Sequence, residues 1–218
     1  MKKLILQKIK DFLFSRKCSV CGRIVEDTGK YICKNCFNIL RKKAQLKNSG
    51  DYYYLFYYEK DIKNIIAQFK FENRKNLSEE LALLTKTAIS QLIKEKNIDI
   101  VIPVPISKKR YRERGFNQVE ELLDKLKIKY YSIEKTRDTK HMYELLDEED
   151  RKKNIENAFK SKINIDNKNI LIVDDIVTTG RTIKEIINEL KKNSKPSNIL
   201  VFSLAMSKVF DKIKNNKS

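Results

Sequence analysis

The chain has 218 residues, of which 41% are apolar and 35% are charged, and its formal net charge is +18. This length and apolar content suit one full α/β domain with a small satellite module, and they exclude a disordered protein. No apolar run reaches transmembrane length. The patterns G-x-G-x-x-G and G-x-x-x-x-G-K-[ST] are absent, so the sequence supports neither a dinucleotide-binding motif nor a P-loop.

More than half of the excess positive charge lies in residues 1–47, which hold thirteen Lys and Arg against three Asp and Glu, a net charge of +10. Such a density of charge favours binding to polyanions, above all nucleic acid or an anionic membrane surface. A surface made basic by a lysine-rich composition throughout the proteome is the alternative explanation.

Residues 1–14 have the pattern of an amphipathic helix, with Leu6, Ile9 and Leu13 on one side. Three charged residues interrupt any apolar core and no small-residue cleavage site follows, so the segment does not fit a signal peptide. We therefore expect a cytoplasmic protein without a transmembrane segment, and weak contact with a membrane surface through this helix stays open.

All four cysteines lie in two C-x-x-C pairs, Cys18 with Cys21 and Cys33 with Cys36, separated by eleven residues. Two such pairs place four thiolates where a tetrahedral zinc ion can bind them. A disulfide would need an oxidising compartment, and a redox C-x-x-C usually occurs singly. The pattern therefore predicts a structural Zn²⁺ site, since four thiolates leave no position for a catalytic water. The metal should supply most of the folding energy of so short a module.

The middle of the chain alternates between predicted strands and helices. Residues 52–58 are rich in tyrosine and predict a strand, and a helix is predicted to begin near Asn76. The buried stripe of that helix comprises Leu77, Leu81, Leu84, Ala88 and Leu92. Residues 98–102 predict the next strand, which ends at Pro103 because prolines stop regular pairing.

The loop that follows, residues 107–114, holds five cations and one acid. Such a loop can bind a pyrophosphate, although a solvated basic loop explains the same composition. Asn117, with a glutamate three residues later, predicts another capped helix. Residues 135–159 are polar and lack a sustained period, which is typical of a mobile lid. Residues 199–204 predict a final strand, and residues 208–218 predict a frayed basic tail.

The most informative stretch is residues 170–182, I-L-I-V-D-D-I-V-T-T-G-R-T. Its first four residues predict a buried parallel strand that places Asp174 and Asp175 at its carboxyl end, where α/β sheets bind ligands. The hydroxyls of a ribose 5-phosphate can donate hydrogen bonds to these carboxylates, and the following turn can bind the phosphate. A solvated D-D turn is the alternative.

Gly180 allows this turn a backbone geometry that is closed to other residues, and lets a phosphate approach closely. The predicted phosphate-binding residues are Thr178, Thr179, Gly180, Arg181 and Thr182. The helix that follows is predicted from the apolar face formed by Ile183, Ile186, Ile187 and Leu190.

At residues 170–182 the chain resembles the type I phosphoribosyltransferases, whose signature is an apolar strand, two acids and T-x-G-x-T at a helix start. The whole chain resembles more closely the ComF family of DNA-uptake and competence-associated proteins, which join a four-cysteine zinc module to such a domain. The resemblance includes Q-F-K-F at residues 68–71 and I-P-V-P-I-S-K-K-R-Y-R-E-R-G-F-N-Q at residues 102–118. It implies an α/β fold, with a type I phosphoribosyltransferase-like parallel sheet flanked by helices in residues 48–218 and the zinc module in residues 1–47.

The resemblance also implies the ligand, phosphoribosyl pyrophosphate (PRPP) with Mg²⁺, and catalytic roles for Asp174 and Asp175. The residues implied to bind the pyrophosphate are Ser107, Lys108 and Arg114. The residues implied to reach the ligand from a closing lid are Arg137, Arg151 and Asn154. Two departures affect these implications: no glutamine follows Thr139 in the lid segment, and Arg181 stands where a small residue is usual.

Three functions fit these observations. The first is a Mg²⁺-dependent phosphoribosyltransferase that breaks the bond between ribose C1 and pyrophosphate, with an acceptor that the sequence does not identify. The second is a non-enzymatic competence factor that binds single-stranded DNA, keeps the PRPP pocket as a sensor or relic, and contacts components of the DNA-uptake machinery. The third is a regulatory adaptor in which PRPP biases partner binding.

Overall fold

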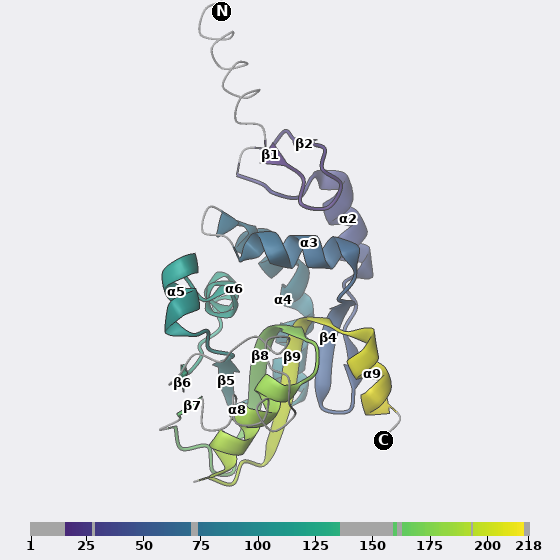
Figure 1. The fold of residues 1–218 in the computed structure, drawn as a ribbon. Coiled ribbons are helices and arrows are strands. Elements are labelled where there is room, and N and C mark those ends of the chain that lie inside the picture. The colour runs from purple at the N-terminus through teal and green to yellow at the C-terminus, as the bar shows by residue number, and fades with distance from the viewer. Residues whose placement is uncertain are drawn as a thin grey trace, which may run out of the picture.

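A computed structural model describes residues 16–27, 29–70, 74–135, 159–160, 163–192 and 194–215. The centre of the fold is a five-stranded sheet in the order β3-β4-β9-β8-β5 (Figure 1). The β3 strand is antiparallel to β4, and the other neighbouring strands are parallel. These strands are β3 (Lys47–Ser49), β4 (Tyr52–Tyr57), β5 (Ile100–Pro103), β8 (Asn169–Val177) and β9 (Asn198–Met206).

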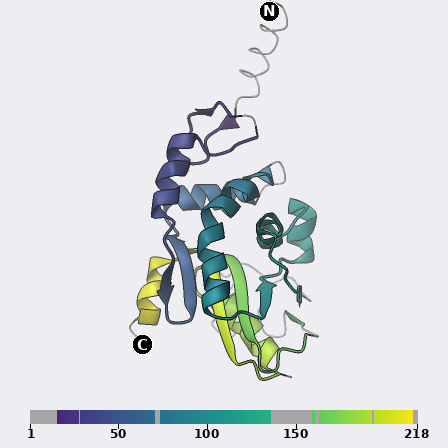
Figure 2. The same cartoon turned by 180° about the vertical axis from the view of Figure 1, so that it is seen from behind.

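Helices cover both faces of this sheet, with α8 in front of it in Figure 1 and α4 in front of it in the reverse view of Figure 2. The helices are α2 (Lys34–Lys43), α3 (Lys60–Phe69), α4 (Leu77–Glu95), α5 (Lys108–Arg114), α6 (Gln118–Leu126), α8 (Arg181–Lys191) and α9 (Lys208–Asn215). A mainly parallel sheet between two layers of helices confirms the predicted α/β fold class.

Two small antiparallel pairs lie outside the sheet. They are β1 (Arg16–Lys17) with β2 (Ile24–Val25), and β6 (Glu134–Lys135) with β7 (Phe159–Lys160). The first belongs to the N-terminal module, and the second joins the two ends of the predicted lid. The predicted lid residues Arg137, Arg151 and Asn154 lie outside the described residues, as does the predicted helix in residues 1–14.

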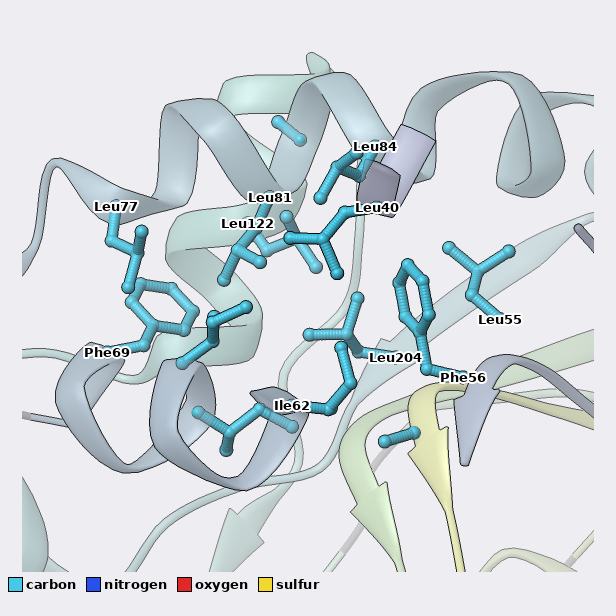
Figure 3. Close-up of a cluster of buried hydrophobic side chains, with 14 of the residues drawn as sticks. Leu40, Leu55, Phe56, Ile62, Phe69, Leu77, Leu81, Leu84, Leu122 and Leu204 are labelled. Atoms are coloured by element: carbon cyan, nitrogen blue, oxygen red, sulfur yellow. The ribbon is translucent and has the colours of Figure 1, made fainter. Parts of the chain in front are cut away.

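Two clusters of buried apolar side chains hold the helices on the sheet. Figure 3 shows one of them, in which Leu40 of α2, Leu81 of α4 and Leu122 of α6 gather above Leu204 of β9. All five residues of the predicted stripe on α4 are buried. Burial of each large apolar side chain contributes about 1.5–3 kcal/mol. The N-terminal module shares this cluster through Cys18, Val25, Tyr31, Ile32, Cys36 and Leu40.

The strand that carries the two aspartates differs from its prediction. It has nine residues and continues past Val173 to Val177, so Asp174 and Asp175 lie within it. Its neighbour β5 stops at Pro103, opposite Val173, whereas β9 pairs with it as far as Val177. The aspartates therefore lie where β5 no longer pairs with β8 and β9 still does.

Two segments that were predicted as a loop and a tail are helices. Residues 108–114 form α5 because the Ser107 hydroxyl accepts a hydrogen bond from the Arg110 amide at 3.3 Å and Gly115, at φ +75, ends the helix. The predicted tail is also wrong, because Phe210 and Asp211 of α9 are buried. The clustered charges of these segments suggested irregular, solvated structure. In α5 the capping residues at both ends define a short helix, and in α9 one side packs on the domain.

The two predicted helix starts are at the expected positions. The side chain of Asn117 caps α6 by accepting a hydrogen bond from the Val119 amide at 3.0 Å. The α4 helix begins after Asn76 as predicted, although the Asn76 side chain makes no capping hydrogen bond. The strand predicted at residues 98–102 is β5, which begins at Ile100.

Candidate functional site

The carboxylates of Asp174 and Asp175 lie beside side chains from two helices that are distant in the sequence. The Oδ2 atom of Asp175 is 3.0 Å from Nζ of Lys70, the residue that follows α3. The same oxygen accepts a hydrogen bond from Nε2 of Gln118, the first residue of α6, at 3.0 Å. Asp174 Oδ1 accepts a hydrogen bond from the Asp175 amide at 2.8 Å. One ammonium and one amide group therefore hold the Asp175 carboxylate in place.

The two carboxyl groups differ in their tendency to ionise. Burial, and after it the charge of Asp175, raises the pKa of Asp174 well above its ordinary value. Burial alone would also raise the pKa of Asp175, but the charge and hydrogen bond of Lys70 and the hydrogen bond from Gln118 lower it overall. Asp175 is therefore the ionised member of the pair. A hydrogen-bond donor from a ligand would stabilise the ionised form of Asp174 most, because burial disfavours that form.

The turn after β8 leads directly into α8. Thr178 and Thr179 are exposed, and Gly180 precedes the first helical residue, Arg181. The first amides of a helix have no partner within the helix and carry the positive end of its dipole. Together with the threonine hydroxyls, they offer donors to an anion beside the aspartate pair. The turn at which the phosphate-binding residues were predicted therefore directly precedes a helix, as expected.

Gly180 is required at this turn for two reasons. Its φ of +68 lies in the left-handed region, which favours glycine. A Cβ atom at this position would also lie 2.6 Å from Cζ of Phe210, so any side chain would collide with that ring. Phe210 belongs to α9 and packs edge to face on Tyr52, with ring centroids 5.1 Å apart. The α9 helix thus packs against the turn through Phe210, a contact that the sequence did not indicate.

The residues implied to bind pyrophosphate lie on or beside α5. Ser107 is buried and uses its hydroxyl to cap that helix. Lys108 is exposed and lies 3.9 Å from Glu134, at the base of the predicted lid. Arg114 donates from Nη1 to Oε1 of Gln118 at 3.0 Å. Because Gln118 in turn donates to Asp175, the basic helix is joined to the aspartate pair through one amide side chain.

Sequence reasoning missed Lys70 and Gln118 as members of this site. Both lie in segments that carry the family resemblance, Lys70 in Q-F-K-F and Gln118 at the end of the long basic segment. Their positions in those segments were the available signal. Nothing in the sequence indicated that the two side chains meet at one carboxylate.

The four cysteine sulfurs form a second candidate site, because they all lie within 4.8 Å of one another. The sulfurs of Cys21 and Cys33 are 3.8 Å apart, in keeping with tetrahedral zinc and Zn–S bonds of about 2.3 Å. The Cys18 sulfur accepts a hydrogen bond from the Cys33 amide at 3.3 Å. Hydrogen bonds from Arg23 lower the pKa of Cys21 to about 6, which favours the thiolate that a metal needs. The cluster can therefore hold a metal such as zinc.

Comparison with known proteins identifies the class to which this fold and site belong. A family model described as a phosphoribosyl transferase domain matches residues 73–214, so the chain contains a domain of that family. Competence protein ComFC of Streptococcus pneumoniae is 30% identical over 200 residues, which are 86% of this chain and 86% of that protein. With these relatives and the four-cysteine cluster, the chain belongs to the ComF family.

Two further relatives match a similar share of this chain. Competence protein F of Haemophilus influenzae is 29% identical over 199 residues, which are 85% of this chain and 82% of that protein. DNA utilization protein YhgH of Escherichia coli is 28% identical over 199 residues, which are 81% of this chain and 84% of that protein. Among the described residues, the helices are too short or too polar to cross a membrane.

Proposed function

We propose that this ComF-family protein binds PRPP with Mg²⁺ and transfers its phosphoribosyl group to an acceptor in a process linked to DNA uptake. The observation that carries the proposal is the aspartate pair of β8 next to the turn that opens α8, with Lys70 and Gln118 on Asp175. The relatives named for competence support the link to DNA uptake.

In the proposed reaction the bond between ribose C1 and a pyrophosphate oxygen breaks, and its electron pair leaves with pyrophosphate. Asp174 and Asp175 would accept hydrogen bonds from the ribose hydroxyls and favour the positive charge that develops at C1. Arg114 and Lys108 would attract the departing pyrophosphate. The lone pair of the acceptor forms the new bond at C1.

Mg²⁺ would neutralise charge on the leaving pyrophosphate. Carboxylate oxygens are the ligands that this ion prefers, and the aspartate pair supplies them. Among the described residues, no third acidic side chain joins this pair in a metal-sized cluster. The phosphate oxygens of PRPP would therefore supply most of the remaining ligands.

The test is a calorimetric titration of the metal-loaded protein with PRPP and Mg²⁺. The double substitution Asp174→Asn and Asp175→Asn keeps side-chain size but removes two acceptors that would both be charged in the PRPP complex. At about 1.5–3 kcal/mol each, their loss should weaken binding by on the order of a hundredfold or more. The matched control is Asp99→Asn. Asp99 precedes β5 and accepts a hydrogen bond at 2.8 Å from the amide of Asn169, the first residue of β8, so it lies at the end of that strand away from the aspartate pair. Parent-like binding by the double variant would exclude the proposed site.

Turnover is measured separately, as release of pyrophosphate from PRPP in the presence of nucleobases and amines. Binding without turnover would favour the sensor or the regulatory adaptor over the enzyme.

A second candidate function is binding to single-stranded DNA, because the last turn of α2, the helix that begins in the cysteine module, carries the exposed cations Arg41, Lys42 and Lys43. Lysines and arginines that replace counterions along the phosphates make such affinity fall steeply with salt. Replacing these three residues by glutamine should weaken binding and reduce its salt dependence. The same change at the exposed lysines of α4 and its end, Lys86, Lys94 and Lys96, is the matched control. Equal losses in both variants would remove α2 as the DNA-binding surface.

Charge substitution is preferable to deletion of residues 1–47 in this test. The described part of that segment shares a hydrophobic cluster with the larger domain, so deletion would expose apolar side chains of α3 and α4. Loss of DNA binding after deletion would then not distinguish a lost surface from a damaged fold.

A further inference from the structure

The first C-x-x-C pair of the cysteine module contacts α3. Ser19 lies between Cys18 and Cys21 and is 3% exposed. Its hydroxyl donates a hydrogen bond to Oε1 of Gln68 at 2.9 Å. Because Ser19 is buried, this bond is shielded from competing water and fixes the first cysteine pair to the last turn of α3.

The second C-x-x-C pair contacts α4. Glu80 is 2% exposed, and its two carboxylate oxygens accept hydrogen bonds from the amides of Tyr31, at 2.7 Å, and Ile32, at 3.0 Å. Ile32 directly precedes Cys33. The guanidinium of Arg74 also lies 5.0 Å from the centre of the Tyr31 ring. Each cysteine pair is therefore fixed to a different helix, the first pair to α3 and the second to α4.

The end of α3 also contacts the candidate ribose site. Lys70 follows α3 and lies two residues after Gln68, and its Nζ is 3.0 Å from Asp175 Oδ2. Lys75, just before α4, pairs with Glu121 of α6 at 2.9 Å. The end of α3 thus contacts the cysteine module through Gln68 and the aspartate pair through Lys70.

The position of Lys70 depends on how the end of α3 is held. Two residues at the end of one helix move together, because the backbone between them is hydrogen-bonded: the Lys70 amide still donates to the carbonyl oxygen of Ile66. A displacement of Gln68 would therefore displace the base of the Lys70 side chain. The cost would be greatest at Asp175, because its carboxylate is mostly buried and needs a cation.

We propose that the cysteine module positions Lys70 for the candidate PRPP site, with Ser19 and Gln68 as positioning residues, so that metal occupancy and ligand binding are coupled. This inference rests on the proposed PRPP binding. Coupling between two sites is reciprocal, so the bound metal should favour PRPP binding and PRPP should favour retention of the metal by the same factor.

The first test is calorimetric titration of the full chain, loaded with zinc, with PRPP and Mg²⁺. Ser19→Ala and Gln68→Ala should each weaken PRPP binding by roughly two- to tenfold, the range expected for one hydrogen bond. The double variant should bind no more weakly than either, because both changes remove the same bond. Gln91→Ala is the matched control, since Gln91 donates to Glu95 at 2.8 Å on the exposed side of α4.

Zinc content and melting temperature are measured for each variant, so that loss of metal is not mistaken for loss of positioning. Saturating PRPP should also slow removal of zinc by a chelator, and this protection should be smaller in Ser19→Ala and Gln68→Ala than in the parent or Gln91→Ala. Parent-like PRPP affinity and parent-like protection in both variants would overturn the proposal.

A measurement without ligand separates this inference from the proposed function. In a double-mutant cycle on the free energy of unfolding, Ser19→Ala and Lys70→Met should be non-additive. Non-additivity in a protein that binds no PRPP would refute the proposed function and support the positioning of Lys70 by the cysteine module. Additive free energies in a protein that binds PRPP would refute the coupling and leave the proposed function intact.

Discussion

Replacing each aspartate of β8 by asparagine should change the stability of the unliganded protein in opposite directions. At neutral pH, Asp174→Asn should raise the free energy of unfolding and Asp175→Asn should lower it. The reason is that burial opposes the charge of Asp174, whereas Lys70 and Gln118 favour the charge of Asp175. Both substitutions keep side-chain size, and an asparagine oxygen at 174 can still accept the Asp175 amide hydrogen bond.

The loss for Asp175→Asn follows from the surroundings of its ion pair with Lys70. The two side chains are 12% and 29% exposed, so the pair lies between a surface pair, worth about 0–1 kcal/mol, and a buried pair, whose disruption costs about 3–5 kcal/mol. An asparagine can still accept the Gln118 hydrogen bond, so we expect a loss of about 1–2 kcal/mol. For a domain of this size that corresponds to a melting temperature lower by roughly 2–8 °C.

The pH dependence of these differences has a definite sign. The pKa of Asp174 is higher in the folded than in the unfolded chain, so its ionisation destabilises the fold as the pH rises. The pKa of Asp175 is lower in the folded chain, so its contribution is present above the unfolded pKa and is lost as the pH falls through the folded pKa. In strongly acidic solution both aspartates are protonated in the folded and the unfolded chain, so the free energy of unfolding of each variant should approach that of the parent.

The assay is thermal and denaturant unfolding of the parent and both variants at neutral and at acidic pH, each loaded with metal and free of PRPP. If Asp174→Asn destabilises the protein at neutral pH as much as Asp175→Asn does, the assignment of the ionised carboxylate to Asp175 is wrong.

Three further predictions concern the turn, the cysteine cluster and the pH dependence of binding. Gly180→Ala should destabilise the protein by about 1–3 kcal/mol, because the residue has a left-handed backbone and an added Cβ collides with Phe210. In unfolding experiments, the loss of stability in the double variant with Phe210→Ala should be smaller than the sum of the losses in the two single variants, because the smaller side chain removes the collision. Purified protein should contain about one zinc ion per chain, and Cys33→Ser should lose it in metal analysis, with a lower melting temperature. PRPP binding should release a proton from Asp174, and PRPP affinity should fall as the pH falls through the raised pKa of Asp174. Calorimetry in buffers of different ionisation enthalpy detects the released proton. Equal heats of binding in all buffers would contradict the prediction.

The sequence by itself determined the local features of this protein. The apolar run before Asp174, the glycine at the turn and the period of the α4 stripe are each read over a few neighbouring residues, so they predicted β8, the start of α8 and the buried face of α4. The spacing of the four cysteines predicted their cluster for the same reason.

Tertiary structure decided which distant side chains meet. Lys70 and Gln118 reach Asp175 from helices about 105 and 57 positions away along the chain. Phe210 reaches Gly180 only because α9 folds back beneath the turn, and a pattern of lysines in that segment predicted solvent instead. Hydrophobic periodicity indicates which face of a helix or strand is buried, but it does not indicate the element against which that face packs. The packing of α3, α6 and α9 on the sheet therefore completed a site of which the sequence had identified only the residues next to one another.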